Sequence, residues 1–160
     1  MNVSAVKSPI EWATMLRDAG LKATSGRVAA LQYLTEHPHC SASALHESIA
    51  ALHPSLSQQS AHNIVRDLTA HGLLRRIELP GSDSALYETR VGDNHHHLVC
   101  VHCHRVEDIN CTVGQSPCLE PDHTHGMRVL EASITFRGIC ADCERDSSSN
   151  SEFTVTTDTP

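Results

Sequence analysis

The sequence predicts an α+β protein made of two small domains. Apolar residues recur at helical spacing as far as Gly72, and short segments with the composition of strands follow. Two Cys-x-x-Cys pairs lie in the second half of the chain, and aromatic residues are scarce throughout. The 160 residues suffice for two small domains. The pattern therefore predicts a helical domain followed by a small mixed domain. The second domain has few residues for an apolar core, and a bound metal would add to its stability.

Four helices are expected before Gly72. Thr24 and Ser57 can cap two of them, because a hydroxyl at this position accepts a backbone N–H that the helix leaves unpaired. Gly20 stands where a left-handed C-terminal residue is favoured. The expected segments are residues 10–19, Thr24 to His37, a stretch from Ser41 or Ser43 to the residue before Pro54, and Ser57 to Gly72.

A hairpin is expected directly after the helices. Residues 73–79 and 85–88 have the pattern of strands, and the intervening Pro80-Gly81-Ser82-Asp83 has turn-forming composition. Helices followed by a hairpin predict a winged helix-turn-helix domain over residues 1–88.

A second, smaller α+β domain is expected over residues 95–144, after a hinge at residues 89–94. Its expected strands are residues 98–101, 105–109 and 132–139. From residue 145 to residue 160 the sequence is rich in Ser and Thr and lacks periodicity, so a disordered tail is expected.

Charge is distributed unevenly along the chain. The formal net charge is -7, but residues 1–80 carry seven Lys or Arg and six Asp or Glu, whereas residues 81–160 carry five and thirteen. The acidity therefore belongs to the C-terminal half, and the N-terminal half remains free to meet phosphates. No segment has the pattern of a membrane span or a cleaved leader, so a cytoplasmic protein without a membrane partner is expected.

The two cysteine pairs, Cys100 with Cys103 and Cys140 with Cys143, can supply four thiolates to one tetrahedral zinc ion. In a reducing cytosol the odd number of cysteines, seven, favours metal ligands or redox groups over a disulfide scaffold. A redox-active Cys-x-x-Cys and two unrelated pairs of buried thiols stay open as alternatives. Four thiolates leave no open coordination position and no catalytic motif occurs, so the chain is not expected to be an enzyme.

Three histidines, His95, His96 and His97, precede the first cysteine pair. On an extended segment His95 and His97 point to one face and His96 to the other. Two imidazoles, joined by carboxylates from elsewhere, would form a nitrogen and oxygen site that accepts Fe(II), Mn(II), zinc or nickel. A solvated histidine run at a hinge is the alternative, and composition does not decide between the two.

Taken in order, these features resemble the ferric uptake regulator family of metal-dependent repressors over roughly residues 10–143. The segments that carry the resemblance are Gly20 to Thr24 followed by Arg27, then His37-Pro38-His39, and then Arg90 to Cys100. They are most similar to the branch found beside catalase-peroxidase genes. This resemblance implies a homodimer that binds a palindromic operator in double-stranded DNA, represses oxidative-stress genes and senses peroxide through Fe(II).

The resemblance also implies two metal sites. A structural zinc is held by the four cysteines of the paired motifs. The regulatory ion, Fe(II) or Mn(II), is held by His37, Glu88, His95, His97 and Asp108. The first two ligands belong to the winged helix and the other three to the second domain. Metal would therefore join the domains and favour the arrangement that binds DNA.

A DNA-reading helix is expected around residues 56–66, from their position in the family. The candidate DNA contacts, including one on an earlier helix, are Arg27, Ser57, Gln59, Ser60, His62, Asn63 and Arg66. The family usually has Thr-Val-Tyr where this chain has Ser60-Ala61-His62, so the target sequence or the affinity is expected to differ. An ordinary solvated helix face is the alternative that composition alone leaves open.

Two further functions remain as alternatives. One is a sibling repressor that answers to iron itself, zinc or nickel, because the same nitrogen and oxygen ligands bind several metals. The other is a thiol-based redox regulator. The residues without a role in the resemblance are Cys40, Cys111, Cys118, His123 and His125. For these, a further metal site or a redox role is weighed against ordinary loop and helix-start positions.

Overall fold

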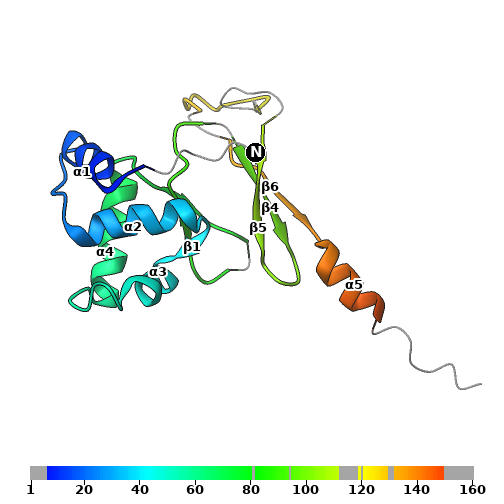
Figure 1. Cartoon of the computed structure of the whole chain (residues 1–160). Coiled ribbons are helices and arrows are strands. Elements are labelled where there is room, and N and C mark those ends of the chain that lie inside the picture. The colour runs from blue at the N-terminus through cyan, green and yellow to red at the C-terminus, as the bar shows by residue number, and fades with distance from the viewer. Residues whose placement is uncertain are drawn as a thin grey trace, which may run out of the picture. The chain divides into compact units, whose positions relative to one another are not determined.

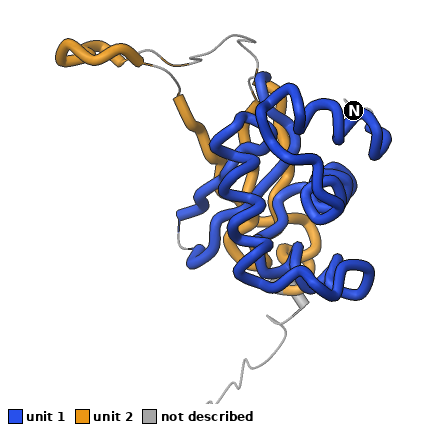
Figure 2. The backbone as a smooth tube through the Cα atoms, turned by 90° about the vertical axis from the view of Figure 1, so that its left-hand side faces the viewer, with its two compact units in different colours: residues 1–93 blue, residues 94–160 orange. Residues whose placement is uncertain are grey.

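The computed structural model describes residues 7–80, 82–93, 95–111, 119, 121–129 and 132–149. The chain divides into two compact units, Met1–Asp93 (unit 1) and Asn94–Pro160 (unit 2), which Figure 2 colours separately. Within the described ranges no helix combines the length and apolar character needed to cross a membrane.

Unit 1 begins with four helices, each capped by a side-chain hydroxyl. They are α1 (Pro9–Asp18), α2 (Ser25–Glu36), α3 (Ala42–Ile49) and α4 (Gln58–Ala70) (Figure 1). Thr24 and Ser57 cap α2 and α4 as the sequence predicts, Ser41 rather than Ser43 caps α3, and Ser8 caps α1. Each hydroxyl satisfies a backbone N–H of the first turn, so these residues fix where the helices begin.

The helices of unit 1 pack around one apolar core. Its large buried side chains include Trp12, Leu16, Leu31, Leu34, Leu45, Val65 and Leu68. They come from all four helices and follow the helical spacing of the sequence. Burying a Leu or Val completely stabilises a fold by about 1.5–3 kcal/mol. This core therefore holds α4 against the other helices.

A three-stranded antiparallel sheet completes unit 1. Its order is β1–β3–β2, and β2 (Arg75–Ile77) and β3 (Leu86–Glu88) form the expected hairpin. The third strand, β1 (Cys40–Ser41), pairs with the other side of β3. β1 was not predicted, because two residues carry no detectable periodicity. Together the helices and the sheet confirm the winged helix-turn-helix fold, in which α3 and α4 form the helix-turn-helix.

Gly26, in the first turn of α2, is expected to be replaceable by Ala with a gain in stability. A Cβ there would lie 3.4 Å from Leu56 Cδ1 and 3.5 Å from Ile64 Cδ1, which are ordinary van der Waals distances. Ala also restricts the unfolded chain, so Gly26→Ala should raise the free energy of unfolding by about 0.4–1 kcal/mol. Thermal unfolding measures this effect.

Gly20→Ala is the matched control for that substitution. Gly20 has a φ of +77°, a left-handed conformation in which a residue with a Cβ costs about 1–2 kcal/mol. Gly20→Ala should therefore lower the melting temperature while Gly26→Ala raises it. A melting temperature that falls in both variants would contradict the close but unstrained packing at Gly26.

Unit 2 contains a second three-stranded sheet, of order β5–β4–β6, and a helix. The central strand β4 (His95–Cys100) pairs antiparallel with β5 (Val106–Asn110) and parallel with β6 (Thr135–Gly138). All three strands fall on segments where the sequence predicts strands, although β4 already begins at His95. A small α+β unit therefore follows the winged helix, as the sequence predicts.

The two faces of the sheet in unit 2 differ in character. Side chains alternate along a strand, so β4 places His95 and His97 on one face and Leu98 on the other. Leu98 lies opposite Phe136 in the β4–β6 register, and these two residues are 40% and 47% exposed. This second face therefore presents large apolar side chains to solvent, which is typical of a surface that meets a partner.

The predicted disordered tail is wrong for its first residues. Helix α5 (Ala141–Ser149) includes Arg145, which pairs with Asp142 one turn earlier. Asp142 also lies in the first turn, where the helix dipole favours a negative charge. These local interactions support a helix in a segment whose composition carries no helical periodicity. Residues 150–160, the rest of the predicted tail, lie outside the described residues.

Candidate metal centres and nucleic-acid interface

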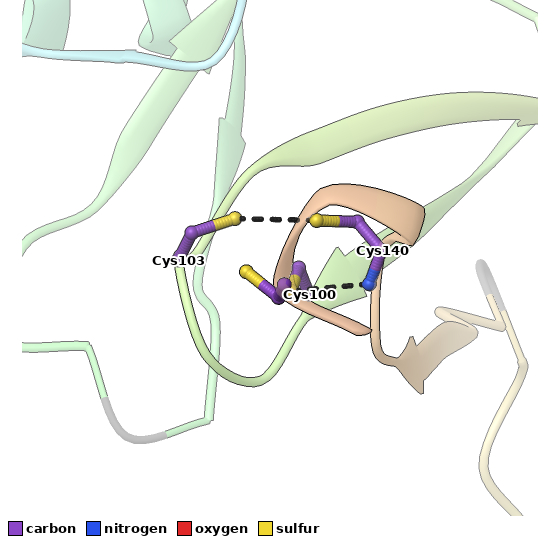
Figure 3. A group of neighbouring side chains, drawn as sticks. Cys100, Cys103 and Cys140 are labelled. Carbon is purple, nitrogen blue, oxygen red and sulfur yellow. Dashed lines mark hydrogen bonds between the residues drawn. The ribbon is translucent and has the colours of Figure 1, made fainter. Parts of the chain in front are cut away.

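Four cysteines of unit 2 converge on one point. Cys100 ends β4, Cys103 lies in the turn after it, Cys140 directly precedes α5 and Cys143 lies in its first turn. Their sulfur atoms all lie within 4.8 Å of one another. Cys103 Sγ is 3.7 Å from Cys140 Sγ, and Figure 3 shows these two side chains together with Cys100. The structure thus brings together the two cysteine pairs singled out in the sequence.

Strand pairing explains how two pairs so distant in sequence meet. Cys100 lies opposite Gly138 in the parallel β4–β6 register, and Cys140 follows two residues later. Val101 N donates to Gly138 O at 2.9 Å, and Cys140 N donates to Cys100 Sγ at 3.4 Å. His104, with a φ of 60°, donates its N–H to Cys100 O at 3.0 Å. The first pair therefore closes a tight turn against the segment that carries the second.

The cysteine cluster fits a tetrahedral zinc ion. Four thiolates about 2.3 Å from zinc would lie about 3.8 Å apart, close to the 3.7 Å between Cys103 and Cys140. Backbone N–H groups, first that of Cys103, lower the pKa of Cys100 to about 5. Hydrogen bonding, first with the Cys140 side chain, and burial raise the pKa of Cys143 to about 12. Cys100 is therefore ready to bind as a thiolate at neutral pH, whereas Cys143 loses its proton only when a metal binds.

A cluster of nitrogen and oxygen donors lies in another part of unit 2. His95 and His97 share one face of β4, and Asp108 of β5 lies opposite His97 in the register. Asp108 Oδ1 is 3.8 Å from His95 Nε2 and 3.6 Å from His97 Nε2. Two donors about 2.1 Å from one ion lie about 3.0–3.6 Å apart, so a small movement brings all three onto one metal. His96 points to the other face, with its ring 6.3 Å from that of Phe136.

Unit 1 contributes a second pairing of an imidazole with a carboxylate. His39 Nε2 lies 3.3 Å from Glu88 Oε2, and Arg75 Nη1 lies 3.6 Å from Glu88 Oε1. Glu88, the last residue of β3, is fully buried. The pairing of Cys40 with Tyr87 in the β1–β3 register brings the adjacent His39 to Glu88. A buried carboxylate with cationic and imidazole neighbours is a candidate metal ligand.

The structure brings His39, and not His37, to Glu88. His37 is exposed at the C-terminal end of α2, where its ring stacks on that of Tyr33 with centroids 4.4 Å apart. Sequence reasoning chose the first histidine of His37-Pro38-His39 and missed the second. The missing signal was β1, because only its pairing with β3 distinguishes the two histidines. The ligand role predicted for His37 therefore has no geometric support, and His39 is the candidate.

Each unit thus provides imidazole nitrogen and carboxylate oxygen atoms, separate from the four thiolates. Nitrogen and oxygen donors suit divalent ions such as Fe(II) and Mn(II), whereas thiolates suit zinc and softer ions. The donor sets therefore fit two different metals.

The outward face of α4 carries most of the candidate DNA contacts. Its exposed side chains include Gln59, His62 and Arg66, and Ser60 and Asn63 are half-buried. Gln and Asn can bond adenine, and Arg can bond guanine or phosphate. Ser57 is different, because its hydroxyl accepts the Ser60 N–H at 3.1 Å and caps the helix. Arg27, the remaining candidate, lies in the first turn of α2 and pairs with Asp67 of α4.

The other cysteines and histidines do not form a cluster of three or more metal-binding side chains within the described residues. Cys40 is half-buried, and burial raises the pKa of its thiol. Cys111 is half-buried, and Cys118 lies outside the described residues. His123 and His125 are exposed, with ring centroids 4.3 Å apart. None of these residues is thereby assigned a function.

Comparison with known sequences gives a match over most of the chain. The profile of the ferric uptake regulator family matches residues 18–137. Transcriptional regulator FurA of Mycobacterium tuberculosis is 38% identical over 141 residues, which cover 88% of this chain and 95% of FurA.

Two solved structures are also similar. The ferric uptake regulator of Helicobacter pylori, whose structure reveals three functional metal binding sites, has a TM-score of 0.65 and 17% identity, over 90% of this chain and 97% of that one. The peroxide stress regulator of Campylobacter jejuni has a TM-score of 0.50 and 29% identity, over 61% of this chain and 70% of that one. The first similarity concerns the fold alone.

Proposed function

The chain belongs to the ferric uptake regulator family of metal-dependent transcriptional regulators, and on this premise we propose that it is a DNA-binding repressor of oxidative-stress genes that senses peroxide through bound Fe(II). One observation carries the proposal: nitrogen and oxygen donors are present in both units. They are His39 and Glu88 in unit 1, and His95, His97 and Asp108 in unit 2.

Zinc in the cysteine cluster stabilises unit 2 in this proposal. Among the described residues of unit 2, Val99 and Cys100 are the only buried apolar side chains. So small an apolar core does not hold a sheet and a helix together by itself. Four thiolates on one ion supply the missing stability, because a structural zinc contributes its binding free energy to folding.

One regulatory ion, Fe(II) or Mn(II), takes its ligands from both units in this proposal. Neither the two donors of unit 1 nor the three of unit 2 fill the coordination shell of an octahedral ion. An ion that takes all five is bound best in the one arrangement of the units in which they meet. Its binding therefore raises the population of that arrangement, which we identify with the DNA-binding form.

Two copies of the chain read a palindromic operator in double-stranded DNA. Residues 1–80 carry a net charge of only +1, so each subunit binds few phosphates. A homodimer doubles their number and places two α4 helices on the two half-sites. The apolar face that contains Leu98 and Phe136 supports pairing through unit 2.

Peroxide relieves repression by altering a metal ligand. Fe(II), when held by these residues, would activate peroxide by lending it an electron, which the imidazole returns as it is oxidised. In the net step, a C–H bond of an imidazole gains one peroxide oxygen, the other oxygen leaves as water, and the imidazole provides the two electrons. The side chains of His95 and His39 are 0% and 10% exposed. Solvent is therefore largely excluded from these two imidazoles, and an oxidant formed beside them reacts with an imidazole before it reacts with water. An oxidised imidazole binds metal less well, and the DNA-binding arrangement is lost.

Peptide mapping by mass spectrometry tests this step. After peroxide treatment of the Fe(II) form, one added oxygen atom is expected on His95 or His39, together with loss of DNA binding. The Mn(II) form is the control, because Mn(II) does not reduce peroxide in this way, and its histidines should stay unmodified. Oxidation confined to cysteines would instead identify a thiol-based redox regulator.

A DNA-binding titration tests the function as a whole. The protein is titrated onto the region upstream of its own gene with Fe(II), Mn(II), zinc or nickel, and then with peroxide. Binding with Fe(II) and its loss with peroxide are expected, and the similarity to the Campylobacter jejuni peroxide stress regulator supports a response to peroxide. DNA binding that requires iron, zinc or nickel and that peroxide leaves intact would instead support the sibling repressor. Binding that no metal affects would contradict the proposal.

A further inference from the structure

Arg27 and Asp67 connect the first turn of α2 to the DNA-reading helix α4. Arg27 Nη2 donates to Asp67 Oδ2 at 2.8 Å, and Arg27 Nη1 donates to Lys22 O at 3.1 Å. The Arg27 side chain is only 17% exposed. Both terminal nitrogens of the guanidinium thus have acceptors inside unit 1, one of them charged. An arginine that binds a DNA phosphate would instead have these nitrogens exposed to solvent.

Close approach of the two helices beside Arg27 supports the same connection. A Cβ on Gly26, next to Arg27, would lie 3.5 Å from Ile64 Cδ1 of α4. Ile64 and Asp67 are three residues apart and therefore share one face of α4. The first turn of α2 therefore lies close to this face of α4 and is joined to it by the Arg27–Asp67 ion pair. Arg66, whose side chain is 71% exposed, lies beside this connection, with its Nη2 3.6 Å from Asp67 Oδ1.

We propose that Arg27 is a positioning residue for DNA recognition, which acts through Asp67 on the orientation of α4 and does not bind phosphate. This inference rests on the proposed DNA-binding function. Base contacts depend on where the side chains of α4 point, whereas attraction to the phosphate backbone depends mainly on charge. The pair therefore contributes to specific binding and little to non-specific binding.

The test uses the full chain, loaded with zinc and Mn(II), and two DNA probes. One probe carries the sequence that the wild-type protein selects from a random pool, and the other is a random duplex. Arg27→Met and Asp67→Asn are each expected to weaken binding to the selected duplex by about 3- to 10-fold, the effect of a partly exposed charged hydrogen bond. Binding to the random duplex should change far less than binding to the selected duplex, because each variant alters the charge by one unit without removing a phosphate contact, and the salt slope should stay unchanged. The double variant should bind no more weakly than Asp67→Asn alone, because Asp67→Asn already removes the Arg27–Asp67 interaction, together with the contact between Asp67 and Arg66 at 3.6 Å.

Direct phosphate binding by Arg27 predicts the opposite pattern. Arg27→Met would then weaken binding to both duplexes and reduce the salt slope by about one for each phosphate that the protein no longer neutralises. Asp67→Asn would tighten binding, because it removes a negative charge beside the DNA. That pattern would overturn the inference. The exchange Arg27→Asp with Asp67→Arg restores an ion pair and should recover selected binding, which a general loss of fold would prevent.

Failure of this inference is distinguishable from failure of the proposed function. A wild-type chain that selects no duplex would overturn the function and the inference together. A wild-type chain that selects a duplex, with both single variants binding it equally well, would overturn only the role of Arg27.

Discussion

Cys140→Ser is expected to remove the structural zinc and unfold unit 2. The substitution takes one thiolate from a closed four-sulfur cluster, and structural zinc in small domains contributes an apparent ~10–16 kcal/mol to folding. The small apolar core of unit 2 does not offset such a loss. Metal analysis should find far less than one tightly bound zinc per chain. Limited proteolysis should digest unit 2 and leave unit 1, which has its own core of residues such as Leu16 and Leu31.

Cys111→Ser is the control for this prediction. Cys111 also lies in unit 2 and is half-buried, but it is not one of the four clustered cysteines. This variant should keep its zinc and its resistance to proteolysis. If Cys140→Ser retained both properties as well, the cysteine cluster would not be what stabilises unit 2.

His39→Ala is expected to abolish metal-dependent DNA binding. The substitution removes the imidazole next to Glu88, and the regulatory ion loses a ligand from unit 1. Even the loss of a residue that only supports a metal ligand weakens metal binding by about 10- to 100-fold, so the loss of a ligand should cost at least as much. Calorimetric titration of the zinc-loaded protein with Mn(II) measures the affinity, and DNA binding across the same titration measures its consequence.

His37→Ala is the matched control, two residues away. His37 is exposed and its ring stacks on Tyr33, so its removal should leave Mn(II) affinity and DNA binding within about 2-fold of wild type. Both variants should keep their zinc, because the cysteine cluster lies in unit 2. A strong effect of His37→Ala together with a weak effect of His39→Ala would return the ligand role to His37.

Local chemistry in the sequence was enough to predict most of the fold. Thr24 and Ser57 could be predicted as helix caps because a hydroxyl residue directly before an apolar periodic segment usually accepts a backbone N–H of the first turn. The hairpin followed from its turn residues, and the cysteine cluster followed from two complete Cys-x-x-Cys pairs. In each case the residues that carry the signal are neighbours in sequence.

The details that were missed depend on interactions between distant residues. His39 could not be separated from His37 without β1, a strand of two residues that exists only through pairing with β3. Likewise, Arg27 has the same appearance in the sequence whether it binds phosphate or Asp67, which is 40 residues away. Contacts that close a long segment of chain leave no periodic pattern in the sequence, so the sequence alone does not reveal which partner such a side chain takes.

The spacing between the two kinds of candidate metal ligand on β4 has a consequence for sequence variation. His95 and His97 lie on one face of this strand, and Cys100 ends it within the zinc cluster. A strand that gained or lost one residue between His97 and Cys100 would turn its preceding side chains to the opposite face. His96 would then face Asp108, and His95 and His97, the two candidate ligands, would face away. The two residues between His97 and Cys100 therefore cannot become one or three without loss of this arrangement.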